Sequence, residues 1–486
     1  MTALRGPAWA VPSFKSKTGR FPLAVEAHVL SMTARLLPGV TTVTTNCRYY
    51  AIHGLVADEA ARRSLSLEDT IDLSRRCEVV FALAAQRLQP SLASSPHGIG
   101  RLEDLTDFEG PYDLAALSTP KTGYSDTAGG FRGPYIGSEI TLGVRDRHSI
   151  EMPGPRFDAS AARGGLAGLL EAADQDVISG DHVKQLTNLT LDPNNANDGP
   201  WLRDLLFTPD SSGDSFYREA DSARRNTAAL LVEATRAVPA RSFNDSFVQF
   251  VAYQLPDGHS DHASAWRGTL LRWYSVGAWR RLWSWLVAQI DGYMPISEVA
   301  DAVVDALGEE DSGRTVSEWM RELPTLTDGQ ALWPAEEEIT ADMEGPAGYL
   351  AVLLLGGQRS TQLTGRARDA LVGRASVLGP EWVRARTEDW GDRSLGEFAR
   401  FIVAEMFRRS HRIAQKKAHL DHETGRVVVP TRVHVDGDLV WKDSLENPGD
   451  VGLRVNQLGG MMSALGLFDV VDDMWAPTAL ASDLFD

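Results

Sequence analysis

The segment Leu67–Leu88 most constrains what this chain can fold into, because its apolar residues recur at the spacing of an amphipathic helix. Cys77, Val80, Phe81 and Ala84 fall on one face of such a helix, and that face needs a partner surface to cover it. Ser66 is a candidate N-cap residue. Similar patterns occur along the chain, and they predict a mainly α-helical protein with small β-hairpins. The predicted helices are 23–36, 48–61, 67–88, 218–238, 247–255, 264–290, 295–307 and 395–420.

Strand signals gather near the end of the chain. Two strand-like runs at 427–430 and 431–441 carry an Asp436-Gly437 pair, which is typical of a hairpin turn. A helix over 451–465 then precedes strands at Phe468–Val471 and 474–476. A helix followed by a hairpin is the order in which winged-helix domains end. We therefore expect a winged-helix-like module here, and a similar tail after 135–143 in the N-terminal region.

Length and composition set the domain organisation that we expect. A chain of 486 residues has room for about three to four domains of ~150 residues. We predict an N-terminal helical domain with a winged-helix-like tail (1–190), a Trp/Arg-rich helical domain ending in an acidic segment (191–345), and a C-terminal helical domain with a winged-helix-like tail (346–486). The spacing of Trp266, Trp273, Trp279 and Trp283 favours packing in a helical core over stacking on bases.

The charge, the cysteine spacing and the length of the apolar runs limit the kinds of protein that this chain can be. The formal net charge is −18, which argues against a surface that binds nucleic acid or lipid everywhere. The two cysteines, Cys47 and Cys77, have neither metal-site nor CxxC spacing. No apolar run approaches the ~20 residues of a membrane span. We expect a cytoplasmic protein without a membrane segment and without a cofactor.

A local basic segment remains within this acidic chain. The predicted helix 395–420 ends with Arg408, Arg409, Arg412, Lys416 and Lys417. Cations on one helix face can neutralise phosphates, so these five residues are candidate contacts to DNA or another nucleic acid. They could equally pair within the chain with the segment 301–346, which holds thirteen Asp and Glu residues against two Arg residues. That acidic segment could instead dock a basic protein, which would make the chain a scaffold.

The loop after the predicted helix 247–255 offers a candidate metal site. Asp257, His259, Asp261 and His262 lie within six residues, and carboxylate and imidazole groups at this spacing can converge on a divalent ion. The alternative function is therefore a metal-dependent nuclease or effector, although a polar surface loop explains the same residues. The sequence contains no P-loop, GxSxG or HExxH motif, which favours a non-catalytic protein.

The stretch 36–57 (LLPGVTTVTTNCRYYAIHGLVA) is dense in hydroxyl, aromatic and basic groups. Arg48 and Tyr49 open a predicted helix after a Thr-rich run, so they could hold a phosphate. The other interpretation is a helix start whose tyrosine rings pack in the core, as buried tyrosines commonly do.

This stretch resembles the LPG-x-x-x-x-T-x-x-x-RYY opening of uncharacterised proteins encoded in prokaryotic antiviral-defence gene clusters. The matching residues are Leu37, Pro38, Gly39, Val40, Val43, Thr44, Arg48, Tyr49 and Tyr50. Weaker likenesses cover 135–143, 408–417 and 454–467. The resemblance implies a component of a defence complex, with other subunits as partners, and it carries no catalytic motif. We therefore expect a non-catalytic component that binds nucleic acid, a partner protein, or both.

Overall fold

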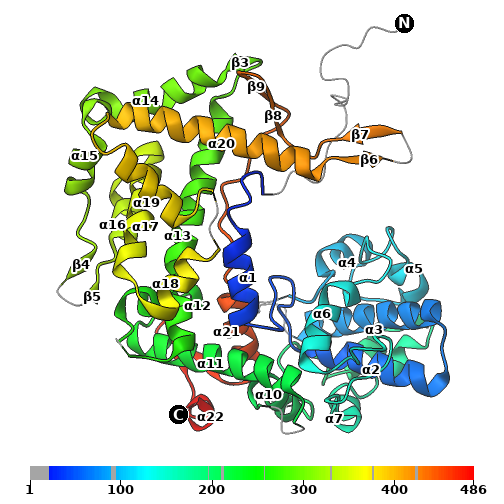
Figure 1. The fold of residues 1–486 in the computed structure, drawn as a ribbon. Helices are drawn as coiled ribbons and strands as arrows, with labels where there is room; N and C mark the ends of the chain where they lie inside the picture. The colour runs from blue at the N-terminus through cyan, green and yellow to red at the C-terminus, as the bar shows by residue number, and fades with distance from the viewer. Residues whose placement is uncertain are drawn as a thin grey trace, which may run out of the picture. The chain divides into compact units, whose positions relative to one another are not determined.

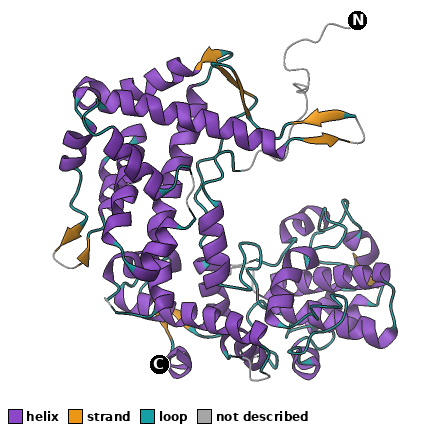
Figure 2. Cartoon of the chain, viewed as in Figure 1, coloured by secondary structure: helices purple, strands orange, loops and turns teal. Residues whose placement is uncertain are grey.

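The computed structural model describes residues 21–88, 95–194, 196–209, 213–256, 258–328, 331–374, 377–421 and 425–485. The chain is mainly helical, with small antiparallel sheets, as the sequence predicts (Figure 2). It groups into two compact units. The α13 unit comprises residues up to Met32 and Val251–Gly452, and the α3 unit comprises Thr33–Phe250 and Leu453–Asp486. The predicted boundaries 1–190, 191–345 and 346–486 stay a prediction, and the two units divide the chain at other places.

The α3 unit is organised around the predicted helix Leu67–Leu88 (α3), which keeps the expected bounds (Figure 1). Cys77, Val80, Phe81 and Ala84 are fully buried, so the apolar face does form core. Short helices pack along α3, and the pair β1–β2 is antiparallel. The elements of this part are α2 (Arg48–Arg63), α4 (Ile99–Leu105), β1 (Tyr112–Asp113), α5 (Leu114–Ser118), α6 (Arg132–Leu142), α7 (Ala159–Gly165), α8 (Leu169–Ala173), β2 (Val177–Ile178) and α9 (Gly180–Gln185).

The same unit contains a second helical group, to which the last residues of the chain return. Helices α11, α12 and α21 contact one another, and the antiparallel hairpin β10–β11 packs on α11 and α21. The ring of Phe243 on α12 stacks on Trp475 of β11, with 4.5 Å between centroids. The elements are α10 (Gly199–Phe207), α11 (Ser215–Ala237), α12 (Phe243–Gln249), α21 (Val455–Ala464), β10 (Phe468–Val471), β11 (Met474–Pro477) and α22 (Ala479–Phe485). Helix α1 (Ala27–Leu36) contains the boundary between the two units.

The α13 unit is built on the long helix α13 (Asp261–Gln289), against which α17 and α18 pack. Trp266, Trp279 and Trp283 are buried, as the prediction of core packing requires, and Trp273 is half-buried. A π-helical turn, Phe250–Gln254, precedes α13. The other helices are α14 (Ile296–Gly313), α15 (Val316–Glu322), α16 (Ala335–Asp342), α17 (Gly345–Gln362), α18 (Gly365–Val372), α19 (Pro380–Asp389) and α20 (Leu395–Lys417).

Among the described residues of this unit there are three small sheets. The largest has the antiparallel order β3-β9-β8, and its strands β8 and β9 form the hairpin predicted at Asp436-Gly437. Gly437 takes a positive φ of 58° in the turn. The hairpin β6–β7 extends from the end of α20 (Figure 1). The strands are β3 (Met294–Pro295), β4 (Thr327–Asp328), β5 (Ala331–Leu332), β6 (His419–Asp421), β7 (Arg426–Val428), β8 (Val433–Asp436) and β9 (Leu439–Lys442).

Candidate nucleic-acid interface

Helix α20 carries the basic residues that the sequence singles out. It begins with a capping box, in which the Ser394 hydroxyl accepts a hydrogen bond from the Glu397 amide and the Glu397 carboxylate bonds back to the Ser394 backbone. Its apolar face is buried through Phe398, Ile402 and Met406. Packing against α14 covers this helix on one side. The cationic last turns also complement the negative end of the helix dipole.

Three of the five predicted contact residues lie on the solvent side of α20. Arg408, Arg412 and Lys416 are exposed, and their spacing of four residues places them along one side of the helix. Arg408 donates to Glu405 within the same helix. In the part of the chain that the structure describes, neither Arg412 nor Lys416 has an acidic partner. These three side chains therefore form an accessible basic row, which we call the α20 row.

The other two residues turn toward the segment that leads into α1. Arg409 Nε donates to the carbonyl of Leu23 at 2.7 Å, and Lys417 Nζ donates to the carbonyl of Phe21 at 3.3 Å. Burial lowers the pKa of both side chains. Arg409 and Lys417 thus hold the N-terminal segment, and the structure does not bring them into the α20 row.

A cavity of about 540 Å³ lies beside this row, and residues of α14, α20 and the β8–β9 hairpin line it. Helix α20 lines it with Arg400, Arg408 and His411. Asp438 of the hairpin turn and Ser297 in the first turn of α14 are the other polar residues of the lining. The remaining lining residues are small or apolar: Ile296, Ala300, Ala404, Val435 and Gly437. The wall that α20 provides thus carries two guanidinium groups and one imidazole ring.

Several carboxylates of the acidic segment 301–346 have partners within the α13 unit. Glu336 is buried and receives both Nε and Nη2 of Arg359, at 2.9 and 2.8 Å. Glu337 accepts the hydroxyl of Tyr274, and Glu338 accepts the indole N–H of Trp333. Several carboxylates that could have docked a partner are therefore used inside the fold. One ion pair, Arg400 to Asp301 at 2.7 Å, does join α20 to this segment.

Arg48 of the N-terminal block is fully buried. Its Nε and Nη2 donate to Asp198 at 3.1 and 3.0 Å. Its Nη1 and Nη2 also donate to the carbonyls of Asn188, Thr190 and Gly165. A guanidinium group that fixes three loop carbonyls and one carboxylate holds separate chain segments together. Arg48 is therefore placed in the core of the α3 unit, away from solvent.

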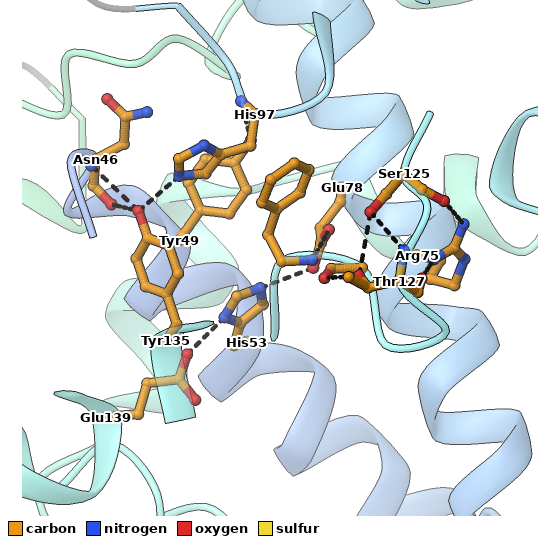
Figure 3. A network of polar contacts seen from close by, with 12 residues as sticks. Asn46, Tyr49, His53, Arg75, Glu78, His97, Ser125, Thr127, Tyr135 and Glu139 are labelled. Carbon is orange, nitrogen blue, oxygen red and sulfur yellow. Dashed lines mark hydrogen bonds and ion pairs between the residues drawn. The ribbon is translucent and has the colours of Figure 1, made fainter. Parts of the chain in front are cut away.

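Tyr49 is also fully buried, in a cluster of aromatic and imidazole rings (Figure 3). Its hydroxyl accepts the backbone N–H of His97 at 2.9 Å. The rings of His97 and Tyr135 lie 4.6 and 5.5 Å from the Tyr49 ring, centroid to centroid. The tyrosine thus packs in the core, which is the second of the two interpretations that its sequence pattern allows.

An ionic network that the sequence did not indicate lies next to Tyr49. His53 Nδ1 lies 2.5 Å from a Glu139 carboxylate oxygen, and Nε2 lies 3.0 Å from Glu78 (Figure 3). Arg145 pairs with the second oxygen of Glu139 at 3.1 Å. Burial by itself would lower the pKa of His53, but the two carboxylates outweigh it and raise the pKa to about 9. The histidine is therefore an imidazolium at neutral pH, and two cations balance two buried carboxylates.

The loop proposed as a metal site is only partly described, because Asp257 lies outside the described residues. His259 accepts the Ser260 amide at its Nδ1 atom. Asp261 is exposed and lies 3.7 Å from Arg366, while burial lowers the pKa of His262 to about 4. Within the described ranges, no group of three or more His, Cys, Asp or Glu side chains is arranged to hold a metal ion.

The sequence does not single out Arg400, His411 or Ser297 of the cavity. A signal for two of them was present in the sequence, because they lie on the same helix as Arg408. Arg400 precedes Arg408 by eight residues, and His411 follows Arg400 by eleven residues. Asp438 and Ser297 come from other elements, so only the fold brings them there.

In the described part of the chain, no helix is long and apolar enough to cross a membrane. Comparison with protein-family models, curated proteins and solved structures found no match.

Proposed function

We propose that this chain is a nucleic-acid-binding component of a prokaryotic antiviral-defence complex in the cytoplasm, and that the α20 row contacts phosphates. The observation that carries the proposal is the exposed, regularly spaced set of Arg408, Arg412 and Lys416. Cations at this spacing follow a helix face and can neutralise phosphates along a strand. The resemblance of the 36–57 stretch to proteins of defence gene clusters supports the choice of cellular system.

The alternative, in which the acidic segment neutralises these cations, has less support. The ion pair of Arg408 stays within α20, and the carboxylates of Glu336, Glu337 and Glu338 face partners of their own. The overall charge of −18 still opposes association with a polyanion. Binding would therefore depend on a local contact and weaken steeply as salt is added.

We also propose that α11, α12, α21 and the β10–β11 hairpin act as a winged-helix-like module that contacts a protein subunit. The supporting observation is that the helix α21 is followed by a hairpin, which is the predicted order, and that both pack with α11 and α12. The hairpin carries Asp469, Asp472 and Asp473 beside exposed Val470 and Val471. These carboxylates would repel phosphate, so a protein partner fits this hairpin better than nucleic acid does.

The test of the nucleic-acid proposal is a salt titration of binding to labelled single-stranded and double-stranded DNA. We expect measurable affinity at low salt for the unmodified chain. The variant with Arg408, Arg412 and Lys416 all changed to Ala should lose most of it. The slope of log affinity against log salt concentration should become shallower by roughly 2–3 for duplex DNA, since each phosphate contact contributes about 0.9.

A matched control removes the same charge elsewhere. Arg62, Arg241 and Arg366 have side chains that are 61%, 81% and 64% exposed, and they lie outside α20. Changing these three to Ala should leave the slope nearly unaltered. No affinity at low salt, or equal losses in the two triple variants, would overturn the role of the α20 row.

A further inference from the structure

The cavity beside the α20 row combines features that point to one class of small ligand. Its volume of about 540 Å³ falls within the range of ~300–1,000 Å³ that small-molecule sites occupy. A lone inorganic anion would leave most of that space empty. A ligand that fills the cavity must therefore contain a larger uncharged part in addition to a charged group.

The cationic wall indicates a phosphate as the charged group. Arg400 and Arg408 lie eight residues apart on α20, and His411 lies close to Arg408 on the same lining. Each arginine uses one nitrogen in an ion pair, Arg400 through Nε to Asp301 and Arg408 through Nη1 to Glu405. Their other N–H groups have no partner among the described residues. Each guanidinium group can therefore still donate hydrogen bonds, and two such groups match the oxygens of a dianion.

The start of α14 adds hydrogen-bond donors to the lining. Ser297 lies in the first turn of the helix and lines the cavity. Pro295 is the N-cap residue and provides no side-chain cap, while the Ile296 amide donates to the Asp438 carbonyl at 2.8 Å. The Ser297 hydroxyl is a further donor, and first-turn amides carry partial positive charge.

The rest of the lining suits the body of a nucleotide. Ile296, Ala300 and Val435 provide an apolar surface for a sugar and base. The Asp438 carboxylate repels a second anion but can accept a hydrogen bond from a sugar hydroxyl. One polar acceptor, one cationic wall and one apolar wall together fit a molecule with a single phosphate end.

We propose that this cavity binds a nucleoside monophosphate through its phosphate monoester, either as a free nucleotide or as the phosphorylated end of a nucleic-acid strand. The second source rests on the proposed nucleic-acid function, and the first does not. Arg400 and Arg408 hold the phosphate, and Asp438 accepts the sugar hydroxyl.

The experiment compares four probes on the full chain by titration calorimetry and fluorescence anisotropy. The probes are adenosine, adenosine monophosphate, an oligonucleotide with hydroxyl ends, and the same oligonucleotide phosphorylated at one end. Three variants accompany the unmodified chain. Arg400→Gln removes one guanidinium group, Ala404→Leu fills the cavity while it preserves every charge, and Arg384→Gln is a control on α19 outside the cavity.

We expect the monophosphate to bind and adenosine to fail. The phosphorylated oligonucleotide should bind about tenfold more tightly than its hydroxyl-ended counterpart, a difference of ~1.4 kcal/mol. Arg400→Gln and Ala404→Leu should abolish monophosphate binding and the end preference. Ala404→Leu and Arg384→Gln should bind the hydroxyl-ended strand as the unmodified chain does, and Arg384→Gln should keep the preference.

The outcomes separate the two proposals. Binding of the monophosphate without binding of either oligonucleotide supports the cavity with a free nucleotide as its ligand, and overturns the nucleic-acid function. Equal binding of both oligonucleotides with no monophosphate binding overturns the cavity proposal and leaves the α20 row in place. Binding of adenosine as tight as that of the monophosphate, or unchanged monophosphate binding in Ala404→Leu, also overturns it.

Discussion

At the scale of single residues, the clearest expectation for stability concerns the His53 network, which consists of His53, Glu78, Glu139 and Arg145. The imidazolium lies between the carboxylates of Glu78 and Glu139, and all three side chains are fully buried. Tyr124 and the Phe131 amide donate to the second oxygen of Glu78, so the carboxylate is well satisfied. Such a network stabilises a fold only while each charge keeps its partner, because an unpaired buried charge is costly.

The substitution His53→Gln should therefore destabilise the α3 unit strongly. It leaves two buried carboxylates with only Arg145 to balance them, and losses of ~3–5 kcal/mol are typical when one partner of a buried ion pair is removed. We expect a lower midpoint in urea-induced unfolding. His148→Gln is the control, since His148 is exposed, and it should unfold like the unmodified chain. Similar midpoints for both variants would contradict the role of the network.

The same histidine predicts a pH dependence. Its pKa is about 9 in the folded chain and near the ordinary ~6.5 when unfolded, so the folded state holds its proton more tightly. The stabilisation is complete below pH ~6.5 and is lost as the pH rises toward about 9. The urea midpoint should therefore fall over this window in the unmodified chain. In His53→Gln the midpoint should fall less, and equal slopes would contradict the assignment.

At the scale of elements, close packing of α21 on α12 can be tested with neighbouring glycines. A Cβ atom at Gly459 would lie 2.2 Å from the Phe243 ring, whereas one at Gly460 would meet no atom within 4 Å. Gly459→Ala should lower stability by ~1–3 kcal/mol through overpacking. Gly460→Ala should be neutral or raise stability by ~0.5–1 kcal/mol, because alanine favours helix. Thermal unfolding checks both, and a tolerated Gly459→Ala would show that α21 does not pack this closely.

At the scale of the whole molecule, the α3 unit is assembled from two distant stretches of chain. Helices α11 and α12 precede the segment Val251–Gly452 of the α13 unit, and α21 with β10–β11 follows that segment. We predict that a flexible Gly/Ser linker in place of 251–452 gives a chain that still folds. Hydrogen exchange should find the amides of α3 as protected as in the full chain, with one cooperative unfolding transition. Unprotected α3 amides would show that the α3 unit depends on the missing residues.

Much of the secondary structure could be predicted, because helices and hairpins depend on local spacing. Helix α3 and strand β10 have the predicted bounds, and α20 and α13 differ only at their ends. The candidate interface was predicted in part. Residues 408, 412 and 416 are exposed as a phosphate contact requires, but 409 and 417 differ because the segment from Phe21 to Leu23 lies against that side of α20. No pattern within a helix can show which of its faces a distant segment will cover.

The sequence by itself determined the helical class, the hairpin at Asp436-Gly437 and the basic end of α20, since each depends on residues within one or two turns of one another. Only the tertiary structure decided that Arg48 and Tyr49 belong to the core, and that His53 gains two carboxylate partners from α3 and α6. It also decided that Arg400, Ser297 and Asp438 share one cavity. The physical reason is that burial and charge pairing depend on contacts between residues far apart in the chain, which local propensity does not encode.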